Sequence, residues 1–192
     1  WYGNLGMMYP MICSEEEMDE VEALVTEVKE ELKAAGVPFK EIRTGIMMET
    51  PAAVMIGEDL AKRVDFLGIG TNDLTQYTMS VDRGNKKVSY LYSTFNPAVL
   101  RSIRHIIACG REAGIMVGMC GEAASDPMMI PLLLAFGLNE FSMSASAMLK
   151  SRKMVMSYST SELQAVADKA MSFATAAETE QYMKEFVENG TV

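Results

Sequence analysis

Short apolar runs alternate with longer amphipathic segments along almost the whole chain. Five runs have the length of a strand: 5–12, 45–48, 64–70, 115–120 and 140–144. Apolar residues at consecutive positions are typical of strands that are covered on both faces, as in a parallel sheet flanked by helices. The pattern therefore predicts an α/β fold with five parallel, buried strands separated by helices.

Helix signals occupy the segments between these runs. Ser14 and Glu17 have the spacing of a capping box, apolar residues then recur every three or four positions, and Gly36 ends the segment. We expect this acidic helix to present a solvated outer face. Further helices are expected after Thr50-Pro51, from Asn96-Pro97 to Gly114, from Asp126-Pro127 to Gly137, and over 160–171 and 178–189.

Polar residues gather at or just beyond the carboxyl ends of the predicted strands: Glu49, Asn72, Asp73, Cys120 and Glu122. A parallel barrel collects its chemistry at that edge, and a doubly wound sheet does so where its strand order reverses. A complete barrel has eight units in about 250 residues, whereas this chain has five units in 192 residues. The pattern thus predicts either an open sheet or part of a barrel.

Glu49 and Asp73 end different strands, and two interpretations of the pair stay open. They could act as a general acid and base or bind a hard cation such as Mg²⁺, which takes one or two carboxylates. Alternatively, each could accept backbone N–H groups at a helix start. Arg83, in the stretch VDRGN, could bind phosphate or carboxylate through its forked donors, although such a turn is also common on surfaces.

Cys120, in the stretch GMCGE, is either a buried structural thiol or a thiol presented to the site as a proton donor or nucleophile. The one histidine, His105, falls inside the helix that begins at Pro97, where we expect an ordinary surface residue. It is not positioned to activate Cys120, so a cysteine-protease arrangement is disfavoured. A shortage of ligands also argues against a zinc site.

Composition and charge exclude some classes of function and indicate a cellular compartment. The net charge is -9 and the pI is about 4.7, which disfavours a general nucleic-acid or anionic-membrane surface. No apolar run reaches the length of about 18 residues that a transmembrane helix needs. Three widely spaced cysteines and no signal-peptide pattern predict free thiols in the cytoplasm. We expect residues 1–192 to form a single domain.

Several long stretches carry a resemblance to a known family. In order, they are GIMMETPAA (45–53), VDFLGIGTNDLTQYTMSVDRGN (64–85), YLYSTFNPAVL (90–100), GMCGEAASDP (118–127) and PLLLAFGLNEFSMS (131–144). Together they closely resemble the C-terminal, phosphoenolpyruvate-binding domain of the enzyme I family, the phosphotransferases of the bacterial sugar phosphotransferase system. Residues 2–12 are similar to the fourth barrel strand of that family.

The resemblance implies the last five units of a (β/α)8 TIM barrel that binds phosphoenolpyruvate and Mg²⁺ at its carboxyl edge. By analogy, Glu49 and Asp73 would bind the metal, and Asn72, Asp73 and Arg83 would bind the substrate. Cys120 would protonate the enolate carbon to give pyruvate. Metal and arginine would supply the charge neutralisation on which phosphoryl transfer depends.

Two parts of the family are expected to be absent: the early barrel strands and the separate domain whose histidine accepts the phosphoryl group before a phosphocarrier protein does. We therefore expect no phosphoryl transfer by this chain alone. An incomplete barrel exposes strand edges and apolar surface, which predicts self-association, such as a homodimer. Pyruvate phosphate dikinase and phosphoenolpyruvate synthase share TNDLTQ and remain an alternative, as does a non-catalytic binding module, although VDRGN and GMCGE favour enzyme I.

Overall fold

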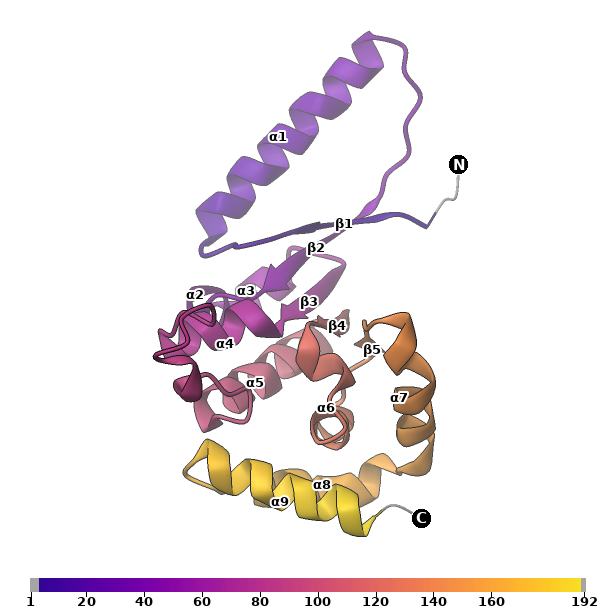
Figure 1. Ribbon diagram of the computed structural model, residues 1–192. Coiled ribbons are helices and arrows are strands. Elements are labelled where there is room, and N and C mark those ends of the chain that lie inside the picture. The colour runs from indigo at the N-terminus through magenta and orange to yellow at the C-terminus, as the bar shows by residue number, and fades with distance from the viewer. Residues whose placement is uncertain (1–3, 191–192) are drawn as a thin grey trace.

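A computed structural model describes residues 4–190 and contains one sheet of parallel strands in the order β1-β2-β3-β4-β5 (Figure 1). The strands are β1 (Gly6–Tyr9), β2 (Arg43–Met48), β3 (Phe66–Gly70), β4 (Met116–Cys120) and β5 (Glu140–Phe141). The α-helices are α1 (Glu15–Ala34), α2 (Pro51–Met55), α3 (Gly57–Ala61), α4 (Thr71–Met79), α5 (Pro97–Ala113), α6 (Met129–Phe136), α7 (Ala145–Ser157), α8 (Thr160–Ala170) and α9 (Ala176–Asn189).

The strand order separates the two architectures that the sequence left open. Each strand pairs with the next one along the chain, and every pairing is parallel. A doubly wound sheet would reverse its order at a switch point, whereas a barrel adds units consecutively. The five units therefore form a partial (β/α)8 barrel, as predicted.

The outer face of the sheet forms the core beneath the helices. Its side chains are 0–2% exposed: Ile46, Met48, Leu67, Ile69, Val117 and Met119. Helix α5 contributes Ile103, Ile106 and Ile107 to the same core. The Asn96 side chain accepts from the N–H of Ala98 at the start of this helix, and Gly114 ends it at a φ of 71°. Burial of each such side chain stabilises the fold by about 1.5–3 kcal/mol.

The inner face alternates large side chains with glycines. The ring of Phe66 lies over Gly45, and a Cβ on Gly68 would come within 2.6 Å of the sulfur of Met8. Glycine at these positions leaves the space that the neighbouring strand's side chain fills, in the layered manner of barrel interiors. A cavity of about 280 Å³ opens on this face, and Cys120 is among its lining residues.

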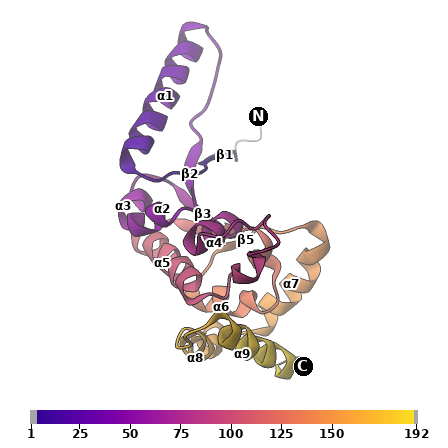
Figure 2. The ribbon, with the colours of Figure 1, turned by 60° about the vertical axis from the view of Figure 1, so that its left-hand side comes forward.

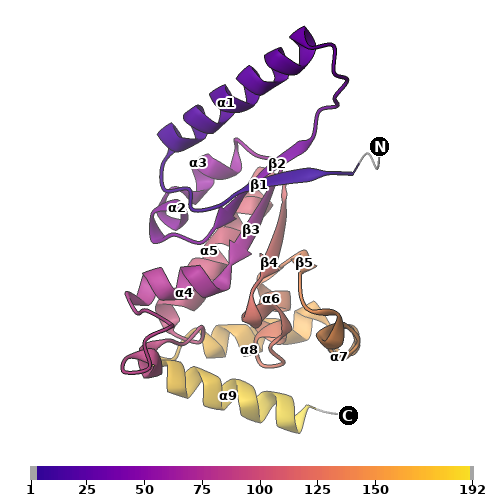
Figure 3. The ribbon, with the colours of Figure 1, turned by 45° about the horizontal axis from the view of Figure 1, so that its top comes forward.

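The N-terminal unit differs from the prediction. The apolar run 5–12 forms a strand of only four residues, and Leu5 and Met7 are 67% and 43% exposed, so a buried strand was wrong there. Helix α1 has the predicted capping box of Ser14 and Glu17, but Met18 is its only buried residue. The helix projects from one end of the molecule, while α8 and α9 lie at the opposite end (Figure 2 and Figure 3).

Two helices were not predicted. Helix α4 begins directly where β3 ends, so Asn72 and Asp73, expected just beyond a strand end, lie in its first turn. Helix α7 follows β5. Cys13, Cys109 and Cys120 are free thiols, as predicted.

None of the helices within residues 4–190 has the length and apolar character needed to cross a membrane.

Candidate functional site

Glu49 follows β2 and is 7% exposed. One carboxylate oxygen accepts a hydrogen bond from the backbone N–H of Met11 at 3.0 Å. The other lies over Gly70, where a Cβ would approach it to 2.5 Å. Burial raises the pKa of Glu49; the Met11 N–H opposes the rise, the charge of Asp73 adds to it, and Arg83 opposes it. The carboxylate of Glu49 is therefore partly desolvated, and it lies close enough to Asp73 and Arg83 for their charges to shift its pKa.

Asp73 and Asn72 occupy the first turn of α4, after the N-cap residue Gly70. A carboxylate oxygen of Asp73 lies 3.3 Å from a guanidinium nitrogen of Arg83. The amide oxygen of Asn72 lies against Gly121, where a Cβ would come within 3.2 Å of it. Gly121 has a φ of 92°, so a side chain here would be both strained and crowded. The glycine thus leaves room for the Asn72 side chain.

Arg83 lies in the loop after α4, and its side chain extends back toward the strand ends. Its backbone N–H donates to the side-chain oxygen of Gln76 at 3.1 Å, which holds the loop against the helix. The side chain is 44% exposed, so its guanidinium can bind an incoming anion as well as Asp73. Nearby, the Tyr92 hydroxyl donates to the backbone oxygen of Asn72 at 3.1 Å.

Cys120 ends β4, and its sulfur lies 3.6 Å from the backbone oxygen of Ile69 and 3.9 Å from the sulfur of Met47. Burial is the largest cause of a raised pKa at Cys120, and the negative charges of Glu49 and Asp73 raise it further. A thiol with a raised pKa stays protonated at neutral pH. This form can give up a proton but is a poor nucleophile.

The structure brings the predicted residues to one edge of β2, β3 and β4. The charges of Asp73 and Arg83 shift the pKa of Glu49, and the charges of Glu49 and Asp73 shift the pKa of Cys120. Two carboxylates and a guanidinium at one edge can hold a divalent cation together with an anionic ligand. The helix-start alternative does not describe Glu49, because the N-cap of α2 is Thr50 and the bond to Glu49 comes from Met11.

Sequence reasoning missed three contributors to this edge: Met11, Tyr92 and Gly121. No sequence signal marked Met11, whose φ of 58° is unusual for a residue with a side chain. Gly121 was visible as part of GMCGE, but only its fold neighbours explain it. His105 lies on α5 with its side chain 39% exposed, so it borders solvent as predicted, and its ring contacts Glu58 and Cys109.

The fold and the site define a class of protein: a barrel domain that holds carboxylates and a guanidinium together at the carboxyl ends of its strands. The model of the family "PEP-utilising enzyme, PEP-binding domain" matches residues 1–160. The chain belongs to this family.

Curated relatives extend the match. Proteins named phosphoenolpyruvate-protein phosphotransferase are 45% identical in Listeria monocytogenes, over 96% of this chain, and 46% identical in Geobacillus stearothermophilus, over 95% of it. The Bacillus subtilis protein of that name is 45% identical over 96% of this chain. In each case the match covers 32% of the relative, so the chain spans about a third of the length of these proteins.

A solved structure supports the fold. The crystal structure of a citrate lyase from Burkholderia xenovorans LB400 matches with a TM-score of 0.56, over 96% of this chain and 64% of the lyase chain. The sequence identity is 16%, so this likeness concerns the fold alone.

Proposed function

We propose that this chain is the phosphoenolpyruvate-binding part of a phosphoenolpyruvate-protein phosphotransferase. The complete protein would transfer the phosphoryl group to a protein histidine and release pyruvate, in the cytoplasmic phosphotransferase system for sugar uptake. One observation carries the proposal: Glu49, Asp73 and Arg83 converge at the carboxyl edge of the barrel strands. The names of the relatives agree with it.

Glu49 and Asp73 are the proposed ligands of Mg²⁺. The fit rests on the oxygen of Glu49 that faces away from Met11, on the neighbouring charge of Asp73, and on hard oxygen donors of the kind Mg²⁺ takes. When bound, the ion would neutralise charge on the substrate oxygens. Arg83 would release Asp73 in part and bind the phosphate, while Asn72 would contact it from the first turn of α4.

Cys120 is the proposed proton donor. Loss of the phosphoryl group from phosphoenolpyruvate leaves pyruvate enolate, whose carbon must accept a proton. The half-buried thiol is held in its protonated form by burial and by nearby carboxylates. Transfer of its proton gives pyruvate and a thiolate, which solvent then reprotonates. In the complete protein, Cys120→Ala should leave substrate binding intact and slow turnover, and loss of binding would contradict this role.

The partners follow from the same proposal. The phosphoryl acceptor would be a histidine of another domain, followed by a phosphocarrier protein. His105 is not that acceptor, because it lies on α5 among Glu58 and Cys109. The exposed apolar residues of β1, Met7 and Met8, favour association with a second copy. A folded monomer in sedimentation at micromolar concentration would contradict self-association.

Calorimetric titration of the chain with phosphoenolpyruvate in the presence of Mg²⁺ tests the site. We expect measurable binding that requires Mg²⁺ and is lost in Asp73→Asn. Asp65→Asn is the matched control, because Asp65 precedes the same strand at its opposite end and accepts a bond from the N–H of Thr44. No heat at millimolar ligand, or equal loss in both variants, would overturn the proposed binding site.

A further inference from the structure

A second group of potential ligands lies on the helical side of the sheet. Glu58 of α3 and His105 and Cys109 of α5 each direct one ligand atom toward the others, and these atoms all lie within 4.8 Å of one another. In the part of the chain that the structure describes, this is the one such convergence of three or more histidine, cysteine, aspartate or glutamate side chains. None of the three belongs to the candidate site at the strand ends.

The two distances from His105 match those between adjacent ligands of a tetrahedral metal ion, and the third pair of ligand atoms lies within 4.8 Å. His105 Nε2 lies 3.6 Å from Cys109 Sγ and 3.6 Å from a carboxylate oxygen of Glu58. Zinc binds nitrogen and oxygen at about 2.0–2.2 Å and sulfur at about 2.3 Å, which separates adjacent tetrahedral ligands by about 3.5 Å. We propose that Glu58, His105 and Cys109 bind a borderline transition-metal ion such as Zn²⁺, with water in the fourth position.

The fold builds the group from two helices. His105 and Cys109 are four residues apart on α5, so they share one face a single turn apart. Gly57 allows α3 to pack closely against this face, since a Cβ there would lie 3.1 Å from the sulfur of Cys109. That close approach brings the next residue, Glu58, to the same place.

The three proposed ligands differ in how far they are exposed to solvent. Cys109 is 2% exposed, whereas the side chains of His105 and Glu58 are 39% and 50% exposed. The sulfur is thus held by the core while the other two ligands border solvent, where an ion can enter and retain a water molecule. A site with one open position is typical of non-structural zinc centres.

The donor set distinguishes this metal from Mg²⁺. Thiolate and imidazole favour zinc and its neighbours, whereas Mg²⁺ prefers carboxylate, carbonyl and water oxygens. Burial, with added charge from Glu58 and Glu112, raises the pKa of Cys109 to about 11. Without metal the thiol is therefore protonated, and a bound ion must displace that proton into solvent.

A metal-free interpretation gives the same distances, because a thiol, an imidazole and a carboxylate can form two weak polar contacts on their own. The two interpretations differ in whether Cys109 becomes a metal thiolate. Co²⁺ reports this difference, because a cobalt-bound thiolate gives a charge-transfer band in the near ultraviolet and tetrahedral Co²⁺ gives strong visible bands.

The experiment titrates the untagged, metal-free chain with Co²⁺ and then adds Zn²⁺. We expect both sets of bands at one equivalent, and their loss when Zn²⁺ replaces Co²⁺. Cys109→Ser should abolish the charge-transfer band. His105→Gln and Glu58→Gln should each weaken Co²⁺ affinity by at least about 10-fold, because loss of even indirect partners costs that much in zinc sites.

Matched controls separate this site from other thiols and acids. Glu112→Gln removes a nearby charge that is not a ligand, and Cys13→Ser removes the exposed thiol; both should retain the bands. Asp73→Asn should also retain them, so the outcome does not depend on the proposed phosphoenolpyruvate site. Absence of a charge-transfer band, or a band that survives Cys109→Ser, would overturn the proposal. Circular dichroism of each variant confirms that it is folded.

Discussion

The N-terminal unit and the units that follow it share one sequence pattern but differ in burial. In both, an apolar run is followed along the chain by helices. Leu67, in β3, is 0% exposed, whereas Leu24, on the apolar stripe of α1, is 61% exposed. A hydrophobic pattern therefore tells which face of an element would be buried. Whether that face is buried depends on surfaces that other elements must provide.

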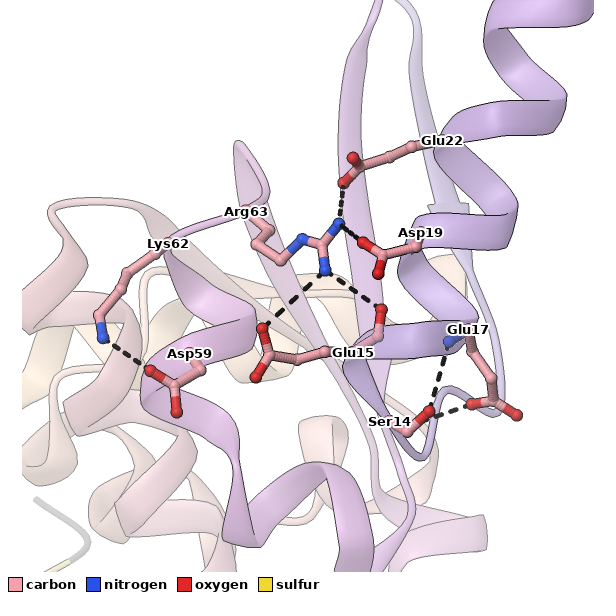
Figure 4. A network of polar contacts seen from close by, with 8 residues as sticks. All are labelled: Ser14, Glu15, Glu17, Asp19, Glu22, Asp59, Lys62 and Arg63. Carbon is pink, nitrogen blue, oxygen red and sulfur yellow. Dashed lines mark hydrogen bonds and ion pairs between the residues drawn. The ribbon is translucent and has the colours of Figure 1, made fainter.

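The two regions are also held by different interactions. The central strands are joined to α2–α6 by a continuous apolar core. Helix α1 is joined to the rest by the buried side chain of Met18 and by Arg63, whose guanidinium contacts Glu15, Asp19 and Glu22 (Figure 4). Ion pairs with exposed partners stabilise by about 0–1 kcal/mol, far less than a core does.

The largest expected effect sharpens this contrast directly. Leu67→Ala leaves a cavity in the core and should lower the free energy of unfolding by about 2–5 kcal/mol. Leu24→Ala makes the same chemical change on α1 and should stay within about 0.5 kcal/mol. Urea denaturation of both variants measures the difference. Equal losses would mean that α1 is buried in solution, and the contrast between the regions would fail.

Met18 should give an intermediate effect. It is 1% exposed and is the one buried residue of α1. Met18→Ala should cost about 2 kcal/mol, at the low end for core truncations, because only one turn of the helix is anchored there. Val28→Ala, at 45% exposure on the same helix, is the control and should have little effect. Comparable effects of the two would contradict the view that α1 is anchored at one end.

Glu49 tests whether burying a carboxylate at the candidate site lowers the stability of the well-buried region. Its pKa is raised in the folded state, chiefly by burial. A group of this kind stabilises the fold below its unfolded pKa, and that stability is lost as pH rises through the folded pKa. Glu49→Gln cannot ionise and keeps an oxygen for the Met11 N–H. We therefore expect this variant to be more stable than the original chain at neutral pH.

Urea unfolding from about pH 4 to about pH 8 measures that gain, which should shrink toward the acid end of the range. Glu122→Gln, which alters an exposed carboxylate just beyond β4, is the matched control and should show no such trend. A loss of stability in Glu49→Gln at neutral pH would show that the carboxylate is structural. It would also remove the argument that a cation is needed to offset its charge.

The same contrast explains how much could be predicted from sequence. The five strands and most helices were predictable because apolar runs and caps such as Ser14 and Asn96 are local signals. Helix α4 was missed because its N-cap residue, Gly70, offers no side chain as a cap. Helix α7 was missed although Ser144, its N-cap residue, is of a type that often caps helices. Helix α4 buries Thr71, Leu74 and Thr75 and is specified by packing against its neighbours, which a local pattern does not record. Helix α7 buries only Ser151, so packing does not explain it.

The candidate site divides in the same way. Glu49, Asn72, Asp73 and Cys120 could be found because each lies at the end of a predicted strand. The return of Arg83 to Asp73 depends on the loop after α4, and the bond from Met11 to Glu49 depends on β1 lying beside β2. Likewise, the four-residue spacing of His105 and Cys109 was present in the sequence, but Glu58 comes from a separate helix that only the fold places there.

The smallest expected effect concerns the connection between the two regions. Arg63→Ala removes the contacts to Glu15, Asp19 and Glu22 and should cost less than about 1 kcal/mol of global stability, less still at high salt. Its local effect should be larger, because those contacts hold the first turns of α1 against the segment before β3. Hydrogen exchange should therefore show faster exchange in α1 and unchanged exchange in β3 and β4. Lys62→Ala is the control: within residues 4–190 Lys62 forms its ion pair with Asp59 of its own segment, and the charge of Glu15 is the smallest influence on it, so this variant should affect α1 much less. If Arg63→Ala left the exchange of α1 unchanged, the Arg63 ion pairs would not be the tether of this helix, and its other contacts, such as the buried Met18 and the Lys29–Glu41 ion pair, would hold it.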